Sequence, residues 1–252
     1  MAFENLRTRA QVGSGAYAGE IDAGLRQHML RVYNYMTSGL VVTGLVAWAM
    51  YSLSFVTEGG NVVGFTELGA AVYGSPLKWL VMLAPLGFIL ALSFGINRMS
   101  FGTLQIVFWA FAAVMGISLA TIFATFTGSS IARVFFITAG TFAAMSLWGY
   151  TTKRDLTRLG GFLIMGLIGI IIASLVNIFI GSSAIQFAVS VIGVLVFVGL
   201  TAYDTQRIKN DYLEMRNHGE AVAKMAVMGA VSLYLDFINL FMMLLSLFGN
   251  RE

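Results

Sequence analysis

The chain has 252 residues, of which 58% are hydrophobic and only 11% are charged, and its mean hydropathy is +0.83. An average soluble domain carries roughly 25% charged residues, so this composition excludes an ordinary water-soluble domain and predicts one integral membrane domain. The net charge of +3 comes from Lys and Arg residues spread along the chain, which argues against a nucleic-acid-binding surface. Cysteines are absent, so disulfides and cysteine-ligated zinc are excluded.

The chain divides into a polar beginning and a long apolar remainder. Residues 1–30 are polar, of mixed charge and without a signal-peptide pattern, so they predict a cytoplasmic N-terminal tail ahead of a membrane domain at 31–250. A membrane-spanning helix needs about 20 mainly apolar residues. Seven runs of this kind predict an all-α, polytopic seven-helix bundle, and they lie at 32–56, 79–97, 101–126, 131–151, 161–180, 184–203 and 225–248.

The distribution of basic residues predicts the orientation of the bundle. With the N-terminus inside and the spans alternating, the inner segments hold twelve Lys and Arg residues and the outer segments hold three. Cytoplasmic loops are enriched in Lys and Arg, so the N-terminus is predicted to be cytoplasmic. A re-entrant segment at 225–248 is compatible with the same count, so the side of the C-terminus stays open. The outer segments are too short for an external domain, and function is expected inside the bundle or at its inner face.

An aspartate, Asp236, interrupts the last apolar run in "SLYLDFINLFMMLL" at 232–245. A charged side chain at the bilayer centre costs roughly 2.5–3.5 kcal/mol, so such residues usually face the bundle interior or a water-filled cavity. Ser232, Asp236 and Asn239 follow each other at helical spacing and form one polar stripe. The alternative to a functional carboxylate is a structural one that accepts hydrogen bonds between helices.

The sixth run carries a similar polar stripe, which includes Ser190 and Thr201 and ends at Asp204. Two such stripes on neighbouring helices would line a shared hydrated seam or, alternatively, pack through hydrogen bonds. If the sixth helix continues inward beside the seventh, Asp204 and Asp236 can meet. Two close carboxylates cannot easily both ionise, so they would share one proton and respond to pH. The pair could also attract Ca²⁺, which prefers carboxylate oxygens.

Three segments carry a resemblance to a known family. "AYDTQRIK" at 202–209, "SLYLDFINLFMMLL" at 232–245 and "GISLATIF" at 116–123 resemble the Bax inhibitor-1 (transmembrane Bax inhibitor motif) family in its bacterial branch. The likeness covers about residues 30–248 of this chain. It implies a multi-pass protein of the inner membrane whose seven-helix bundle forms a pH-sensitive calcium leak, without a nucleotide, haem or organic cofactor.

The resemblance also implies roles for single residues. Asp204 and Asp236 match the two aspartates of the family's pH sensor, and they could bind Ca²⁺, the permeant ion. Arg98, at the inner end of the second span, matches an arginine that engages the first aspartate in the closed state. A plain positive-inside anchor is the alternative role for Arg98. The predicted path adds four polar side chains: Ser190, Thr201, Ser232 and Asn239.

Enzyme and retinal-protein classes fit poorly, so no catalytic residue is predicted. Intramembrane aspartyl proteases place a first aspartate in a Tyr-Asp motif, which "AYD" matches, but they place the second in Gly-x-Gly-Asp, where this chain has Leu-Tyr-Leu before Asp236. Their Pro-Ala-Leu element is also absent, because both prolines precede residue 90. A retinal protein needs a lysine buried in mid-helix, whereas Lys224 lies at the predicted inner edge.

A non-conducting membrane regulator is the second function that the sequence leaves open. Some bacterial members of the resembled family are associated with modulating a membrane-bound quality-control protease. The segments 1–30 and 205–224 could supply contacts to such a partner. The lipid bilayer is the partner that the composition itself requires.

Overall fold

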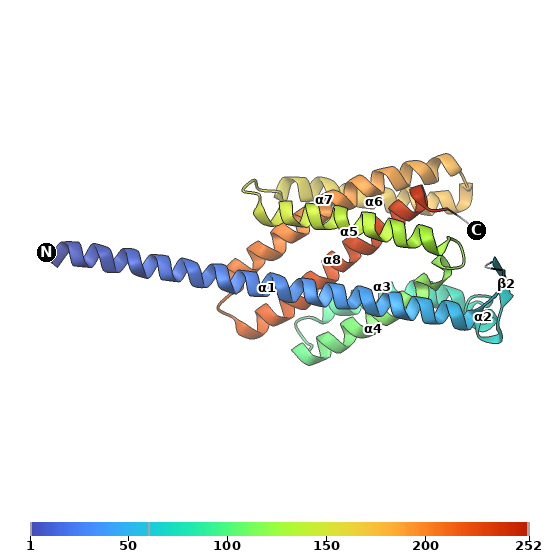
Figure 1. The fold of residues 1–252 in the computed structure, drawn as a ribbon, viewed down its shortest axis with the longest axis horizontal. Coiled ribbons are helices and arrows are strands. Elements are labelled where there is room, and N and C mark those ends of the chain that lie inside the picture. Colours follow the sequence, from blue (N-terminus) through green and yellow to red (C-terminus); the bar gives the residue numbers. More distant parts are fainter. Residues whose placement is uncertain (1, 60, 251–252) are drawn as a thin grey trace.

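The structure is a computed structural model that describes residues 2–59 and 61–250; for residues 2–22 and residue 61 it describes the backbone alone. Eight α-helices and one β-hairpin follow each other in the described residues (Figure 1). Their bounds are α1 Ala2–Ser54, β1 Phe55–Glu58, β2 Asn61–Phe65, α2 Glu67–Val72, α3 Leu77–Gly95, α4 Phe101–Leu119, the short 3₁₀ helix η1 Ala120–Ile122, α5 Gly128–Thr151, α6 Thr157–Ile180, α7 Ser183–Met215 and α8 Gly219–Phe248.

Seven of the described helices are long and apolar enough to cross a membrane, which confirms the predicted all-α membrane bundle. They are α1 and α3 to α8, with the candidate span of α1 beginning at Ala23. The helix α1 begins well before its expected run, at Ala2, and the last two helices are also longer than expected, because α7 continues to Met215 and α8 begins already at Gly219. The segment between the two apolar runs, rich in Lys, Arg, Asp and Glu, is therefore mostly helical.

Local sequence explains where several helices begin and end. Ser100, Thr127 and Ser182 precede α4, α5 and α7, and the side-chain oxygen of each accepts a hydrogen bond from the backbone N–H three residues later. Such caps satisfy donors that the first turn of a helix leaves unpaired. Gly181 ends α6 in the left-handed region at φ 68°, which glycine adopts without steric cost. These caps permit the short connections that hold the helices side by side.

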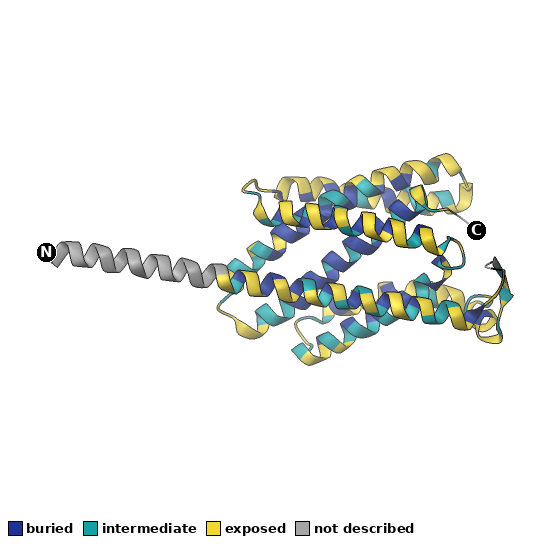
Figure 2. Ribbon diagram, in the orientation of Figure 1, coloured by how far each residue is buried: buried dark blue, intermediate teal, exposed yellow. Residues whose placement is uncertain are grey.

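The helix α8 forms the centre of the bundle. It packs against α1, α4, α5 and α7, whereas α3 packs mainly on α4 and α6 mainly on α7. Figure 2 shows buried residues concentrated along α8 and exposed residues on the outer helices. Phe94 on α3 and Phe179 on α6 are 81% and 90% exposed, as expected for side chains that face lipid. Asp236 therefore lies on the helix that is most enclosed by protein.

Two regions differ from the sequence expectation. The segment between the first two predicted spans contains most of the hairpin β1–β2, in which Phe55 pairs with Phe65, and also the short helix α2. The boundary expected between a tail at 1–30 and the membrane domain falls inside α1. Leu25 and Met29 are buried in the core, so the packed part of the bundle includes the end of the predicted tail. Packing against distant helices, which composition does not reveal, decides this boundary.

Candidate functional site

The two aspartates of the predicted pair lie in the interface between α7 and α8, which run side by side. Asp204 on α7 is 9% exposed and Asp236 on α8 is 4% exposed. Their carboxyl groups lie close enough to interact directly with each other. No hydrogen-bond donor of the described residues reaches Oδ2 of Asp236. A carboxylate only accepts hydrogen bonds, so two neighbouring carboxyl groups form a hydrogen bond only when one of them carries a proton.

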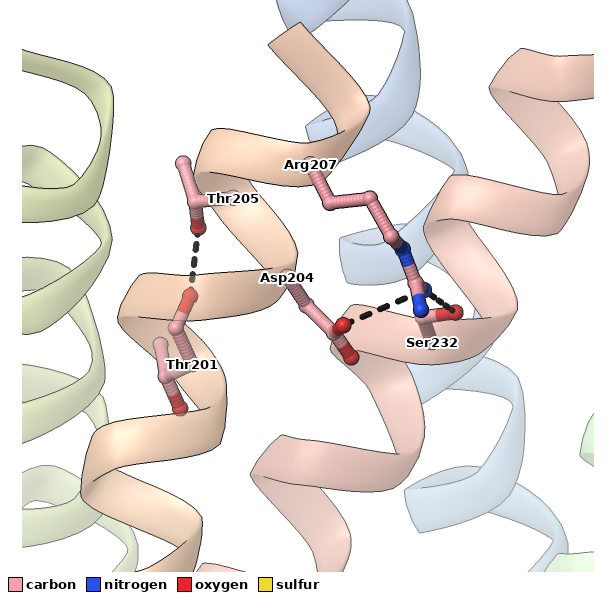
Figure 3. Close-up of polar contacts among 5 residues, drawn as sticks. All are labelled: Thr201, Asp204, Thr205, Arg207 and Ser232. Atoms are coloured by element: carbon pink, nitrogen blue, oxygen red, sulfur yellow. Dashed lines mark hydrogen bonds and ion pairs between the residues drawn. The ribbon is translucent and has the colours of Figure 1, made fainter. Parts of the chain in front are cut away.

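Arg207 contacts Asp204 of the pair and also reaches Ser232 of α8 (Figure 3). Its Nη2 lies 3.1 Å from Oδ1 of Asp204 and donates a hydrogen bond of 3.1 Å to Oγ of Ser232 on α8. The Arg207 side chain is 42% exposed, whereas that of Asp204 is 12% exposed. Arg207 follows Asp204 by three residues, so both side chains lie on one face of α7. One guanidinium thus compensates the charge of Asp204 and also links α7 to α8.

Gln206 links the turn of α7 that carries Asp204 to the connection between α5 and α6. Its Oε1 accepts from the N–H of Leu156 at 2.8 Å and its Nε2 donates to the carbonyl of Arg154 at 2.8 Å. Both partners belong to the connection between α5 and α6, and Asp204 is only about 3 Å away from Gln206 along the axis of α7. The aspartate pair therefore lies near the end of α5 and the beginning of α6.

A pocket of 260 Å³ adjoins the exposed side of Arg207. Ser232 and Asp211 line it together with His28 of α1. His28 is buried, its two ring nitrogens have no hydrogen-bond partner among the described residues, and its ring stacks on Tyr212 at 4.8 Å. The sequence placed His28 outside the apolar runs and therefore did not predict its burial. The guanidinium of Arg207 therefore faces this pocket on one side and contacts Asp204 on the other, and neither aspartate lines the pocket.

The remaining residues of the predicted path are closely packed in this structure. The hydroxyl of Ser190 donates to Ser246 of α8 at 3.0 Å, so the two stripes also meet at their other end. Thr201 donates to the carbonyl of Phe197 at 2.8 Å, and Asn239 donates to the carbonyl of Leu235 at 2.8 Å, each within its own helix. These bonds satisfy the polar groups without water, as in hydrogen-bonded packing.

The structure does not bring Arg98 to Asp204. Arg98 is exposed in the turn after α3, and among the described residues the ion pair of Asp204 is formed by Arg207. The spacing of Asp204 and Arg207 in "YDTQR" was the available sequence signal, because residues three apart meet on a helix. The closed-state contact of Arg98 stays a prediction.

A chain of hydroxyl groups beside the site was not predicted from the sequence. Thr205 donates to the carbonyl of Thr201 at 2.7 Å, so the 2.9 Å bond between Thr205 and Ser146 must be donated by Ser146. The hydroxyl of Tyr33 then donates to Ser146 at 2.6 Å. This chain links α1, α5 and α7 one residue away from Asp204. Its members are up to 172 positions apart in the sequence, so no local pattern indicates it.

The backbones of α5 and α7 approach closely next to the site. A Cβ atom at Gly149 would lie 2.2 Å from the carbonyl oxygen of Ala202, so no larger residue fits between the helices without a backbone shift. Small residues permit this contact in membrane helix pairs. Gly149 therefore helps to set the position of the turn that carries Asp204.

Most of the sequence is similar to one protein family and to several bacterial proteins. The chain matches the family described as "Inhibitor of apoptosis-promoting Bax1" over residues 25–252. It is 46% identical to an uncharacterized protein of Rickettsia prowazekii over 237 residues, and 46% identical to one of Caulobacter vibrioides over 239 residues, with 92% of both chains covered in each case. It is also 45% identical to the inner membrane protein YbhL of Escherichia coli K12, over 91% of this chain and 94% of that protein. The chain therefore belongs to the Bax inhibitor family of membrane proteins.

Proposed function

We propose that this protein is a pH-sensitive leak for calcium ions, gated by the shared proton of Asp204 and Asp236. The proposed role is passive transport and not catalysis. The observation that carries the proposal is the contact of two buried carboxyl groups from neighbouring helices, with one cation on their open side. Buried ionisable groups in membrane proteins commonly mark ion and proton pathways.

The arrangement supports a gate because Arg207 responds to the charge of the pair. When the pair holds one negative charge or two, the guanidinium is attracted to Asp204 and remains bonded to Ser232 of α8. When the pair is fully protonated, the ion pair is lost, and the link between α7 and α8 is reduced to the bond with Ser232. Acidification is therefore expected to loosen the interface and open a path between these helices.

The oxygen ligands of the aspartate pair fit a calcium ion that binds weakly during permeation. Calcium takes about six to eight oxygen ligands, whereas the pair offers two carboxylates. Among the described residues, no cluster of three or more Asp, Glu or His side chains could complete a metal site. Conduction requires binding that is weak enough for the ion to leave. Two carboxylates with nearby hydroxyl groups meet that requirement.

The proposed location follows from charge and from the relatives. The E. coli relative is an inner membrane protein, and we extend this location to the present chain. The predicted inner segments hold twelve basic residues and the outer segments three, and this excess favours a cytoplasmic N-terminus. The site, which lies near the α5–α6 connection with its basic residues Lys153 and Arg154, would then face the cytoplasm.

Calcium flux into liposomes that contain only the purified protein tests the proposal. We expect flux to increase as the pH on the side of the site falls. In Asp236→Asn the flux should fall by roughly tenfold, which corresponds to the loss of one ionic contact, and its pH profile should change, because Asp204 then titrates without a second carboxyl group. Asp155→Asn is the matched control, because Asp155 is an exposed aspartate in the α5–α6 connection.

Two results would decide against the leak. The absence of flux at every pH from correctly folded protein would favour a non-conducting regulator of a membrane partner, such as a quality-control protease. An unchanged pH response in both Asp236→Asn and Asp204→Asn would show that another group senses the proton.

A further inference from the structure

A long groove runs between α1 and α5 on the outside of the bundle. It has a volume of 930 Å³, within the range of about 300–1,000 Å³ that is usual for ligand pockets. The wall from α1 extends from Arg26 to Leu45, which corresponds to about 28 Å along a helix. A second cavity of 330 Å³ shares Leu40 and Phe135 with it and continues toward the far end of α5. The groove thus covers most of the thickness of a bilayer core, about 30 Å.

The chemistry along the groove is asymmetric. Its middle is lined by apolar side chains such as Met36, Val41 and Leu147. The end near the N-terminal part of α1 carries Arg26 and the hydroxyl-bearing Tyr33 and Tyr150, and the described side chains that line the groove include no acidic one. An amphiphile with a long apolar tail and an anionic head matches this distribution.

The cationic end is available to such a head group. Arg26 is exposed, and no acidic partner of Arg26 is found among the described side chains. Lys209 lies directly behind the groove, because its Nζ donates to the carbonyl of Tyr150 at 2.7 Å. Basic pockets between membrane helices are known to bind anionic lipid head groups.

The geometry points to a lipid-binding site: the groove between α1 and α5 holds one acyl chain of an anionic phospholipid from the bilayer, and Arg26 pairs with its phosphate. The tail lies against Phe237, the floor of the groove, which contacts the rings of Phe135 and Phe142 at 5.5 and 5.6 Å. Phe237 directly follows Asp236 on α8. The lipid would therefore contact the helix turn that carries one of the two buried carboxyl groups. The binding site does not depend on whether the protein conducts calcium.

Native mass spectrometry of the detergent-solubilised protein tests this site. Phosphatidylglycerol and phosphatidylcholine with the same acyl chains serve as anionic and zwitterionic probes. We expect the wild type to retain one phosphatidylglycerol, with an affinity about fivefold above that for phosphatidylcholine, as one added cation at a membrane surface provides. Arg26→Gln should remove this preference, whereas Arg158→Gln, an exposed arginine at the start of α6, should keep it.

A second pair of variants tests the tail. Ala143 lines the groove, and Ala144 is the next residue of α5, which is also exposed but lies outside the groove lining. Ala143→Trp should abolish lipid retention, while Ala144→Trp should leave it unchanged. Equal retention in both variants would overturn the site, and so would a wild type that retains neither lipid. A dimer mass in place of a lipid adduct would show that a second copy of the chain covers the groove.

Discussion

Arg207 and Asp204 form an ion pair of 3.1 Å in which the cation is 42% exposed and the carboxylate side chain is 12% exposed. The arginine thus lies between the pocket at the end of the bundle and the buried aspartate pair. An exposed ion pair contributes little to stability, whereas removing one partner of a buried charge is costly. The partial burial of Asp204 makes Arg207 the residue through which a charge change on the pair can alter the α7–α8 interface.

Whether Arg207 or Arg98 is the cation that acts on the aspartate pair can be tested directly. In Arg207→Gln we expect the pH profile of calcium flux to move to higher pH by about one unit, because protons are retained more readily without the neighbouring positive charge. Arg98→Gln is the matched control, since Arg98 does not contact Asp204 in this structure. A profile moved by Arg98→Gln and not by Arg207→Gln would assign the latch to Arg98.

The direction of the hydrogen bond between Tyr234 of α8 and Thr43 of α1 predicts that removing one partner reduces the free energy of unfolding more than removing the other. Thr43 donates its hydroxyl hydrogen to the carbonyl of Ala112 at 2.8 Å, so Tyr234 must donate the 2.6 Å bond to Thr43. Tyr234→Phe removes only this donor and should cost about 1 kcal/mol, whereas Thr43→Val leaves the buried tyrosine hydroxyl unpaired and should cost about 2 kcal/mol. Unfolding of both variants by SDS in mixed micelles measures the difference. Equal losses would contradict the inferred direction.

The close approach of α5 to α7 predicts that Gly149 tolerates no side chain. Gly149→Ala places a methyl group 2.2 Å from a backbone oxygen of α7 and should reduce the free energy of unfolding by about 2 kcal/mol. Gly140 lies on the same helix, and a methyl group added there would meet no other side chain or helix within 4 Å, so Gly140→Ala should change stability by less than about 0.5 kcal/mol. The same micelle unfolding assay applies. A harmless Gly149→Ala would mean that the helices can separate at this point.

Asp155, outside the membrane spans, provides a titration reference for the aspartate pair. Hydrogen bonds from the hydroxyl and then the N–H of Thr157 hold the pKa of Asp155 below its ordinary value of 3.8. Its folded pKa is lowered, so its contribution to stability is present above pH 3.8 and is lost as the pH falls through the folded pKa. In Thr157→Val the pKa should rise toward 3.8, as carboxyl-carbon NMR titration would show. A pKa of Asp155 that does not change in this variant would refute the assigned cause.

The sequence by itself determined the class of this protein and the number of its spans. Seven runs of about 20 apolar residues are sufficient, because the transfer of each run into lipid depends on the run itself and not on its neighbours. The residues that matter in the pair were also visible: Asp236 stands out in an apolar run, and Asp204 ends a polar stripe. Helical periodicity placed each aspartate on an inward face, but it could not measure their separation.

Only the tertiary structure decided which side chains meet. Arg207 bonds to Ser232 because α7 continues as a helix beyond its apolar part and lies beside α8. Arg98 lies in the turn after α3 and does not pair with Asp204. Tyr33 meets Ser146 across 113 positions. Such contacts depend on the packing of helices that are distant in the chain, and packing is a collective property that no local window of sequence contains. For the same reason the groove between α1 and α5 could not be foreseen from either helix alone.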